Sequence, residues 1–173
     1  MLESGQDWEV AALITSFRVC FYFAENNNVP RETLQRWNMK NEYMEVAIKE
    51  SLKAYKKGEV PVGAVIVKNN KIIAKSHNTI EKKKNAINHA EINAIRIASK
   101  KLKNWRLIDC DLYVTLQPCK MCEGAIELSR IQNVYYAASR NETNFKNKFK
   151  MIKLSNYNSD YLNILKNFFK DKR

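Results

Sequence analysis

The stretch PCKMC, residues 118–122, constrains the fold of this chain more than any other feature. It places two of the four cysteines three positions apart, directly after a proline. At this spacing Cys119 and Cys122 project from one side of a helix, and Pro118 favours the first turn of such a helix. Neighbouring thiols without a regular cysteine framework are more typical of metal binding or catalysis than of disulfides. The fold must therefore bring a further ligand to the start of this helix.

That further ligand is present in the stretch NHAEINA, residues 88–94. His89 stands at the expected start of another helix, and Glu91 follows two positions later. One imidazole and two thiolates are the ligand set of a catalytic zinc ion, which leaves its fourth position to water. The positive ends of both helices also favour thiolate over thiol. We therefore expect His89, Cys119 and Cys122 to bind zinc.

The chemistry expected at this site is hydrolytic deamination. Zinc lowers the pKa of bound water to roughly 7, so that the water can attack a ring carbon bearing an amino group. The water must lose a proton and the leaving amine must gain one, and we expect Glu91 to move both. A structural zinc site is the alternative, but it normally recruits a second Cys or His pair. Here His77, Cys20 and Cys110 are isolated, and both of these cysteines are expected in apolar packing.

Helical and β-strand patterns alternate from Met39 onward. The expected helices cover residues 42–57, 89–100, 118–129 and 160–170, and the expected strands cover residues 60–68, 71–77, 110–116 and 133–138. Gly58 is expected to end the first helix, and Asn69-Asn70 to form a hairpin turn. Residues 139–150 are expected to be a polar, basic connection. An antiparallel hairpin followed by alternating strands and helices predicts one mixed sheet between helical layers.

Residues 1–38 differ in composition from the rest of the chain. They contain three arginines, no lysine and five acidic residues, a net charge of −2, whereas residues 39–173 contain 27 basic and 13 acidic residues, a net charge of +14. Two short helices are expected in the first segment, the second over residues 29–37 with Pro30 in its first turn. We therefore expect an N-terminal helical extension of unknown role over residues 1–38 and a zinc-dependent deaminase domain over residues 39–173.

Charge and apolar patterning bear on partners and location. A strongly basic domain suits a polyanionic partner, nucleic acid above all, although an AT-rich coding genome also enriches lysine. The longest apolar stretch, residues 10–24, is interrupted by Arg18 and falls short of the roughly 18 residues that a spanning helix needs. Acidic residues precede it, whereas a signal peptide begins with basic ones. We therefore expect a cytoplasmic protein without a membrane segment.

Four further stretches of the chain bear on its family: EVPVGAVIV, HAEINAIR, NWRLIDCDLYVTLQPCKMC and FFKDKR. Together with the pattern H-x-E…P-C-x-x-C, they closely resemble bacterial tRNA adenosine deaminases, which are zinc enzymes acting on a nucleobase. The resemblance covers residues 39–173 and none of residues 1–38. It implies a cytidine-deaminase-like α/β/α fold around a mixed five-stranded sheet, with one Zn²⁺ per subunit. It also implies a homodimer that converts wobble adenosine to inosine in the anticodon stem-loop of tRNA.

The resemblance also implies roles for individual residues. Asn78 matches the asparagine that touches the flipped nucleotide. Val62, Gly63 and Ala64 match the strand that walls the base pocket. These residues are therefore expected to bind substrate.

The sequence departs from the family pattern at two places. Gln117 replaces the usual glutamate before the Pro-Cys pair. Ser139, Arg140 and Asn141 stand where the family usually has an acidic residue, in a short Asp-x-Lys-x-Gly loop that contacts the ribose of the target nucleotide. We expect Arg140 to hold a phosphate instead of a 2′-hydroxyl, because a guanidinium contacts phosphate bidentately. This difference in the loop bears on whether the protein prefers RNA or DNA and on its exact substrate, but not on the deamination itself.

Basic side chains are expected to hold the phosphates of the RNA. These residues are Lys82, Lys83, Lys84, Lys146, Lys148, Lys170 and Arg173. Two alternatives remain open. One keeps the fold but takes a free nucleobase, guanine or cytosine, as substrate, and such an enzyme has no need of so basic a surface. The other is a non-catalytic RNA-binding partner subunit, which could dispense with Glu91.

Overall fold

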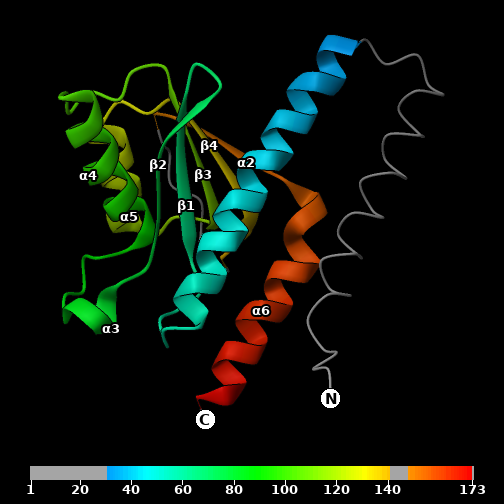
Figure 1. The fold of residues 1–173 in the computed structure, drawn as a ribbon, viewed down its shortest axis with the longest axis vertical. Coiled ribbons are helices and arrows are strands. Elements are labelled where there is room, and N and C mark those ends of the chain that lie inside the picture. Colours follow the sequence, from blue (N-terminus) through cyan, green and yellow to red (C-terminus); the bar gives the residue numbers. More distant parts are fainter. Residues whose placement is uncertain (1–30, 141–147, 173) are drawn as a thin grey trace, which may run out of the picture. The chain divides into compact units, whose positions relative to one another are not determined.

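The computed structural model describes residues 31–140 and 148–172 (Figure 1). The chain divides into two compact units, Met1–Lys40 and Asn41–Arg173. The second unit contains the described strands and the candidate site, and the helix that enters it begins in the first unit. Among the described residues, no helix is long and apolar enough to cross a membrane.

The described elements of regular structure alternate between helix and strand for most of the chain. The helices are α2 (Arg31–Tyr55), α3 (Ile80–Lys83), α4 (Ala90–Leu102), α5 (Lys120–Leu128) and α6 (Asn158–Asp171), with a 3₁₀ turn at Ser155–Tyr157. The strands are β1 (Gly63–Lys68), β2 (Lys71–His77), β3 (Cys110–Leu116), β4 (Asn133–Ala138) and β5 (Lys150–Lys153). They form a five-stranded sheet in the order β2-β1-β3-β4-β5.

The sheet is mixed and lies between two layers of helices. Strand β1 is antiparallel to β2 and to β3, whereas β3, β4 and β5 are parallel to one another. Helices α4 and α5 cover one face, and α2 and α6 cover the other (Figure 1). The predicted α/β/α fold around a mixed five-stranded sheet is therefore confirmed. Because β2 and β3 both run antiparallel to β1, their C-terminal ends lie at the same end of the sheet. Helices α4 and α5 begin at this end.

Two of the sequence expectations about elements were wrong. Separate helices were expected over residues 29–37 and 42–57, but α2 runs continuously from Arg31 to Tyr55. This stretch contains neither proline nor glycine, so nothing in it forces a break. The local pattern also indicated no strand at Lys150–Lys153, where β5 follows the expected polar connection of residues 139–150. Four residues with lysine at both ends show no usable alternation, so only the resemblance implied a fifth strand. The first expected helix, over residues 7–28, lies outside the described residues.

Other expectations from the sequence are confirmed. Asn69 and Asn70, between β1 and β2, both have positive φ, 49° and 57°, as a two-residue hairpin turn of this kind requires. Gly58 follows the end of α2 with φ +71°, a conformation that favours glycine. Cys110 is 1% exposed and belongs to the main apolar core between the sheet and α4 and α5. Its packing role therefore agrees with the expectation, and Cys20 lies outside the described residues.

Gly63, the first residue of β1, is packed tightly against helix α2. A β-carbon at this position would overlap the carbonyl oxygen of Ala47 and lie 2.6 Å from the backbone nitrogen of Ser51. Both are backbone atoms of a helix, so neither can rotate aside as a side chain could. Only glycine therefore lets α2 approach β1 this closely.

We expect Gly63→Ala to lower the free energy of unfolding by about 3 kcal/mol, because α2 must move away from β1. Urea unfolding followed by circular dichroism measures this change. Gly124 of α5 is the matched control, since a β-carbon there meets no atom within 4 Å. Gly124→Ala should raise the stability by up to about 1 kcal/mol through helix propensity. Equal stabilities of the two variants would contradict the close contact at Gly63.

Candidate active site

Helices α4 and α5 each begin at a residue of the predicted metal site. His89 is the N-cap of α4 and Cys119 is the N-cap of α5, while Cys122 lies in the first turn of α5. The Sγ atoms of Cys119 and Cys122 lie 3.7 and 3.5 Å from Nδ1 of His89. The three ligand atoms lie within 4.8 Å of one another, so these residues could hold a metal ion. The structure thus brings together three residues that are far apart in the sequence.

The three side chains strongly influence one another's protonation. Hydrogen bonds with Cys122 and His89 lower the pKa of Cys119 to about 3, which favours its thiolate form. The contact with Cys119, together with burial, raises the pKa of Cys122. The hydrogen bond to Cys119 raises the pKa of His89, although burial acts in the opposite direction. An imidazole beside two sulfurs is a donor set that suits zinc.

Glu91 lies beside this group, in the first turn of α4. The residue is 2% exposed, and its Oε2 is buried without a hydrogen-bond partner among the described residues. Burial raises the pKa of Glu91 above its usual value. An unpartnered buried carboxyl oxygen is costly unless something outside the protein contacts it. The arrangement therefore fits a metal ion and a water molecule between Glu91 and the His-Cys-Cys group.

Asn78 follows β2 and connects two segments of the candidate site. Its Oδ1 accepts a hydrogen bond of 2.8 Å from the backbone N–H of Ala90, and its Nδ2 donates one of 3.1 Å to the carbonyl of Val60. Ala90 is the first residue of α4, so this side chain satisfies one of the free N–H groups at the helix start. Within the described residues, Nδ2 donates to Val60 alone, so its second hydrogen could contact a ligand. Its predicted contact with a flipped nucleotide stays a prediction.

We expect Asn78→Ala to lower the free energy of unfolding by about 2 kcal/mol, because it leaves the buried backbone N–H of Ala90 unpaired. Asn85→Ala is the matched control. Asn85 is exposed, and its Oδ1 accepts a hydrogen bond from the backbone N–H of Ile87. That substitution should cost less than about 1 kcal/mol. Thermal unfolding of both variants checks the difference, and similar losses would show that Asn78 does not hold α4 in place.

The segment expected to wall the base pocket is buried at the start of β1. Residues 62–64 are all buried, and Val62, the most exposed hydrophobic side chain among them, is only 3% exposed. Tyr161 of α6 is fully buried, and its hydroxyl donates a hydrogen bond of 2.7 Å to the carbonyl of Pro61. Sequence reasoning missed Tyr161, because an aromatic residue in an amphipathic helix is usually only packed. The signal was its hydroxyl, which needs a partner when buried.

The two places where the sequence departs from the family pattern contact each other. The backbone N–H of Arg140 donates to Oε1 of Gln117 at 3.2 Å, and Nε of Arg140 donates to the carbonyl of Gln117 at 2.7 Å. Because Gln117 precedes Pro118 and Cys119, this contact keeps the guanidinium close to the metal-binding group. Arg140 is near enough for its charge to act on His89.

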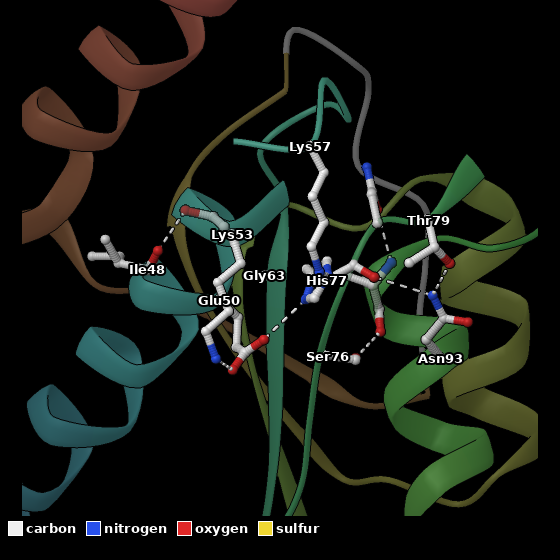
Figure 2. A network of polar contacts seen from close by, with 12 residues as sticks. Ile48, Glu50, Lys53, Lys57, Gly63, Ser76, His77, Thr79 and Asn93 are labelled. Atoms are coloured by element: carbon white, nitrogen blue, oxygen red, sulfur yellow. Dashed lines mark hydrogen bonds and ion pairs between the residues drawn. The ribbon is translucent and has the colours of Figure 1, made fainter. Parts of the chain in front are cut away.

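A polar network links the end of β2 to helices on both faces of the sheet (Figure 2). Nδ1 of His77 lies 2.9 Å from Oε2 of Glu50 of α2, and Nε2 lies 3.0 Å from Nζ of Lys57. The carbonyl of His77 accepts a hydrogen bond of 3.1 Å from Asn93 of α4. Burial acts to raise the pKa of Glu50, but hydrogen bonds from Lys53 and His77 outweigh it and lower this pKa. Sequence reasoning missed this network because no local pattern joins the three elements.

The residues predicted to contact RNA lie in several parts of the fold. Residues 82–84 are exposed on α3 and directly after it. Lys148 forms an ion pair of 3.0 Å with Glu127 of α5, and Lys170 is exposed near the end of α6. Outside the described residues lie Lys146, Arg173 and Asn141.

Comparison with known proteins places the chain among deaminases. The family model for MafB19-like deaminases matches residues 38–173. The tRNA-specific adenosine deaminase of Buchnera aphidicola subsp. Schizaphis graminum (strain Sg) is 40% identical over 148 residues, 79% of this chain and 97% of that protein. The tRNA-specific adenosine deaminase of Bacillus subtilis (strain 168) is 53% identical over 96 residues, 56% of this chain and 60% of that protein. The chain thus spans less than two thirds of this second relative.

Solved structures share the fold. One, from a study of A-to-I editing by tRNA:A34 deaminases at the wobble position of transfer RNA, is 34% identical with a TM-score of 0.61, covering 65% of this chain and 97% of that one. A guanine deaminase from Bacillus subtilis is 39% identical with a TM-score of 0.55, covering 57% of this chain and 64% of that one. The two proteins differ in the substrates that their descriptions name.

Proposed function

The chain belongs to the MafB19-like deaminase family, and from this premise we propose that it converts wobble adenosine to inosine in the anticodon of tRNA. The observation that best supports hydrolytic deamination is Glu91, a buried carboxyl with an unpartnered oxygen beside one imidazole and two sulfurs. Relatives described as tRNA-specific adenosine deaminases support the choice of substrate. We assign the activity to residues 39–173 and leave residues 1–38 as an extension outside it.

His89, Cys119 and Cys122 would hold one Zn²⁺ per subunit. When bound there, zinc supplies Lewis-acid activation of a water molecule. The starts of α4 and α5 position the backbones of these residues, because His89 and Cys119 are N-cap residues and Cys122 lies in the first turn of α5. This preorganisation leaves little ordering cost to metal binding.

Glu91 moves the protons of the reaction. Its Oε2 accepts a proton from the attacking water and delivers it to the leaving amine, so that adenosine and water yield inosine and ammonia. The raised pKa caused by burial suits a group that must both accept and return a proton near neutral pH. The apolar packing of α4 against the sheet excludes other water from this carboxyl.

Asn78, Arg140 and the start of β1 orient the nucleotide. Residues 62–64 wall the base, the remaining hydrogen of Asn78 Nδ2 donates to the nucleotide, and the Arg140 guanidinium contacts a phosphate. The contact between Arg140 and Gln117 supports this role, since it anchors the guanidinium through Nε and leaves its terminal nitrogens for the ligand. A wobble base is already unpaired in the anticodon loop, which lowers the cost of extruding it.

We further propose that the protein acts in the cytoplasm as a homodimer on the anticodon stem-loop. The net charge of +14 over residues 39–173 supports a polyanionic substrate. The RNA surface proposed from the sequence includes residues 82–84, Lys148 and Lys170, which the structure describes, and Lys146 and Arg173, which it does not. Sedimentation equilibrium measures the oligomeric state directly.

One assay tests the proposed reaction and its substrate. Purified protein is given an anticodon stem-loop with a wobble adenosine, and inosine is measured by nuclease digestion and chromatography. Free guanine and free cytosine are tested in parallel by ammonia release. We expect inosine from the stem-loop and no ammonia from either base.

A specific observation favours guanine deamination as the second candidate, namely the structural likeness to the guanine deaminase of Bacillus subtilis. Ammonia from guanine without inosine from the stem-loop would establish that alternative and reject the tRNA substrate. Neither product from zinc-loaded protein would instead support a non-catalytic RNA-binding subunit.

A further inference from the structure

Lysines from two distant parts of the chain meet at the turn after α2. Lys56 and Lys57 follow the helix directly and are exposed. Nζ of Lys172, which follows α6, donates a hydrogen bond of 2.8 Å to the carbonyl of Gly58. The rings of Tyr55 and Phe168 contact each other at 5.7 Å between centroids, which keeps the two helix ends side by side. The ammonium group of Lys172 therefore lies at the turn that carries Lys56 and Lys57, and the Lys57 ammonium lies 3.0 Å from Nε2 of His77.

The buried side chain of Glu59 holds α3, which carries further lysines, next to this turn. Glu59 is 1% exposed, and its carboxylate accepts hydrogen bonds from the backbone N–H groups of Glu81 and Lys82 at 3.1 and 2.8 Å. These bonds fix the start of α3 against the residue that follows Gly58. The contacts at Gly58 and Glu59 thus bring together three segments that carry exposed lysines, which we call the lysine cluster: Lys56, Lys57, Lys82, Lys83 and Lys172.

Among the described residues, the buried acidic side chains near the lysine cluster already have other partners. Glu59 is buried and bonded to α3, and Glu50 is buried and bonded to Lys53 and His77. Among the acidic side chains that the structure describes here, Glu81 is the exposed one. Several cations against one exposed acid form a site for a ligand with several regularly spaced negative charges.

The lysine cluster borders the candidate active site through a short connection. Residues 59–62 join it to β1, and along this connection the carbonyls of Val60 and Pro61 accept hydrogen bonds from Asn78 and Tyr161. We propose that the lysine cluster binds the phosphates of the RNA strand that flanks the nucleotide being deaminated. This inference rests on the proposed function and adds Lys56, Lys57 and Lys172 to the residues that contact RNA.

A second lysine pair provides a matched control. Lys100 and Lys101 are exposed in the last turn of α4, whereas His89 caps its beginning. A helix of 13 residues is about 20 Å long, so this pair lies at the far end from the site (Figure 1). Lys56→Gln/Lys57→Gln and Lys100→Gln/Lys101→Gln remove the same charge, and glutamine at position 57 can still contact His77.

The experiment measures binding of a fluorescein-labelled anticodon stem-loop by anisotropy at several salt concentrations, together with kcat and KM for inosine formation. For Lys56→Gln/Lys57→Gln we expect Kd and KM to rise about tenfold at low salt and kcat to stay unchanged. The slope of log Kd against log salt concentration should fall by an amount that corresponds to about one to two phosphate contacts. The control pair should change Kd and KM by less than about twofold.

The possible outcomes separate the two proposals. If the unmodified protein forms inosine but the two double variants change Kd and KM equally, or neither changes them, the proposed role of the lysine cluster is wrong. Weaker binding of the first pair alone, without inosine from the unmodified protein, would support the RNA surface and reject the proposed reaction.

Discussion

Replacing Glu91 by glutamine is expected to reduce inosine formation by at least about a thousandfold and to leave metal binding intact. General acid–base groups contribute roughly 10² to 10⁴ in rate, and here one carboxyl handles two proton transfers. Glutamine has nearly the same shape but cannot accept and return a proton. Single-turnover inosine formation and zinc content by atomic absorption measure the two effects separately.

Glu123→Gln supplies a control for this substitution. Glu123 is also a buried glutamate in the first turn of a helix, α5, but it is not part of the His-Cys-Cys group. The Glu123→Gln protein should keep its zinc and most of its turnover. A Glu91→Gln protein with near-normal activity would remove Glu91 from the proposed mechanism, and one that lost zinc would make Glu91 part of metal binding.

Removal of either thiol at the start of α5 is expected to abolish both metal binding and activity. With Cys119→Ala or Cys122→Ala, two protein ligands remain, fewer than the three or four that zinc sites in proteins use. We expect the zinc content to fall from about one per chain to near zero and turnover to fall below detection. Zinc content, inosine formation and circular dichroism together distinguish metal loss from unfolding.

Cys110→Ala is the matched control for the two thiols. Cys110 is buried in the apolar core and outside the metal-binding group. The variant should lose about 1–2 kcal/mol of stability and keep full zinc content. Zinc bound normally by both Cys119→Ala and Cys122→Ala would refute the predicted ligand set.

The sequence predicted the fold best where local patterns and chemistry agree. Strands β3 and β4 match their expected ranges, because both are apolar runs flanked by clear helix or turn signals. The spacing of Cys119 and Cys122 and the stretch containing His89 indicated which residues the fold must bring together. Their roles in binding and catalysis stay predictions, although the structure places the three side chains in contact.

What the sequence could not predict depends on contacts between distant segments. The local pattern did not show where β5 lies, because that short strand is defined by its pairing with β4. The bonds between Arg140 and Gln117, and between His77 and Glu50, join residues 23 and 27 positions apart. No periodicity records such pairs, because each residue alone looks like an ordinary polar surface residue.

The hydrogen bond between Tyr161 and Pro61 has a consequence for synthesis of the protein on the ribosome. It joins residues 100 positions apart, and the bond from Tyr157 to the carbonyl of Asn41 joins residues 116 apart. The segment before β1 therefore lacks its α6 partner until residues 157–161 have left the exit tunnel. Contacts of such long range also slow folding. A nascent chain arrested before α6 emerges should accordingly be sensitive to protease between α2 and β1, well after both have been translated.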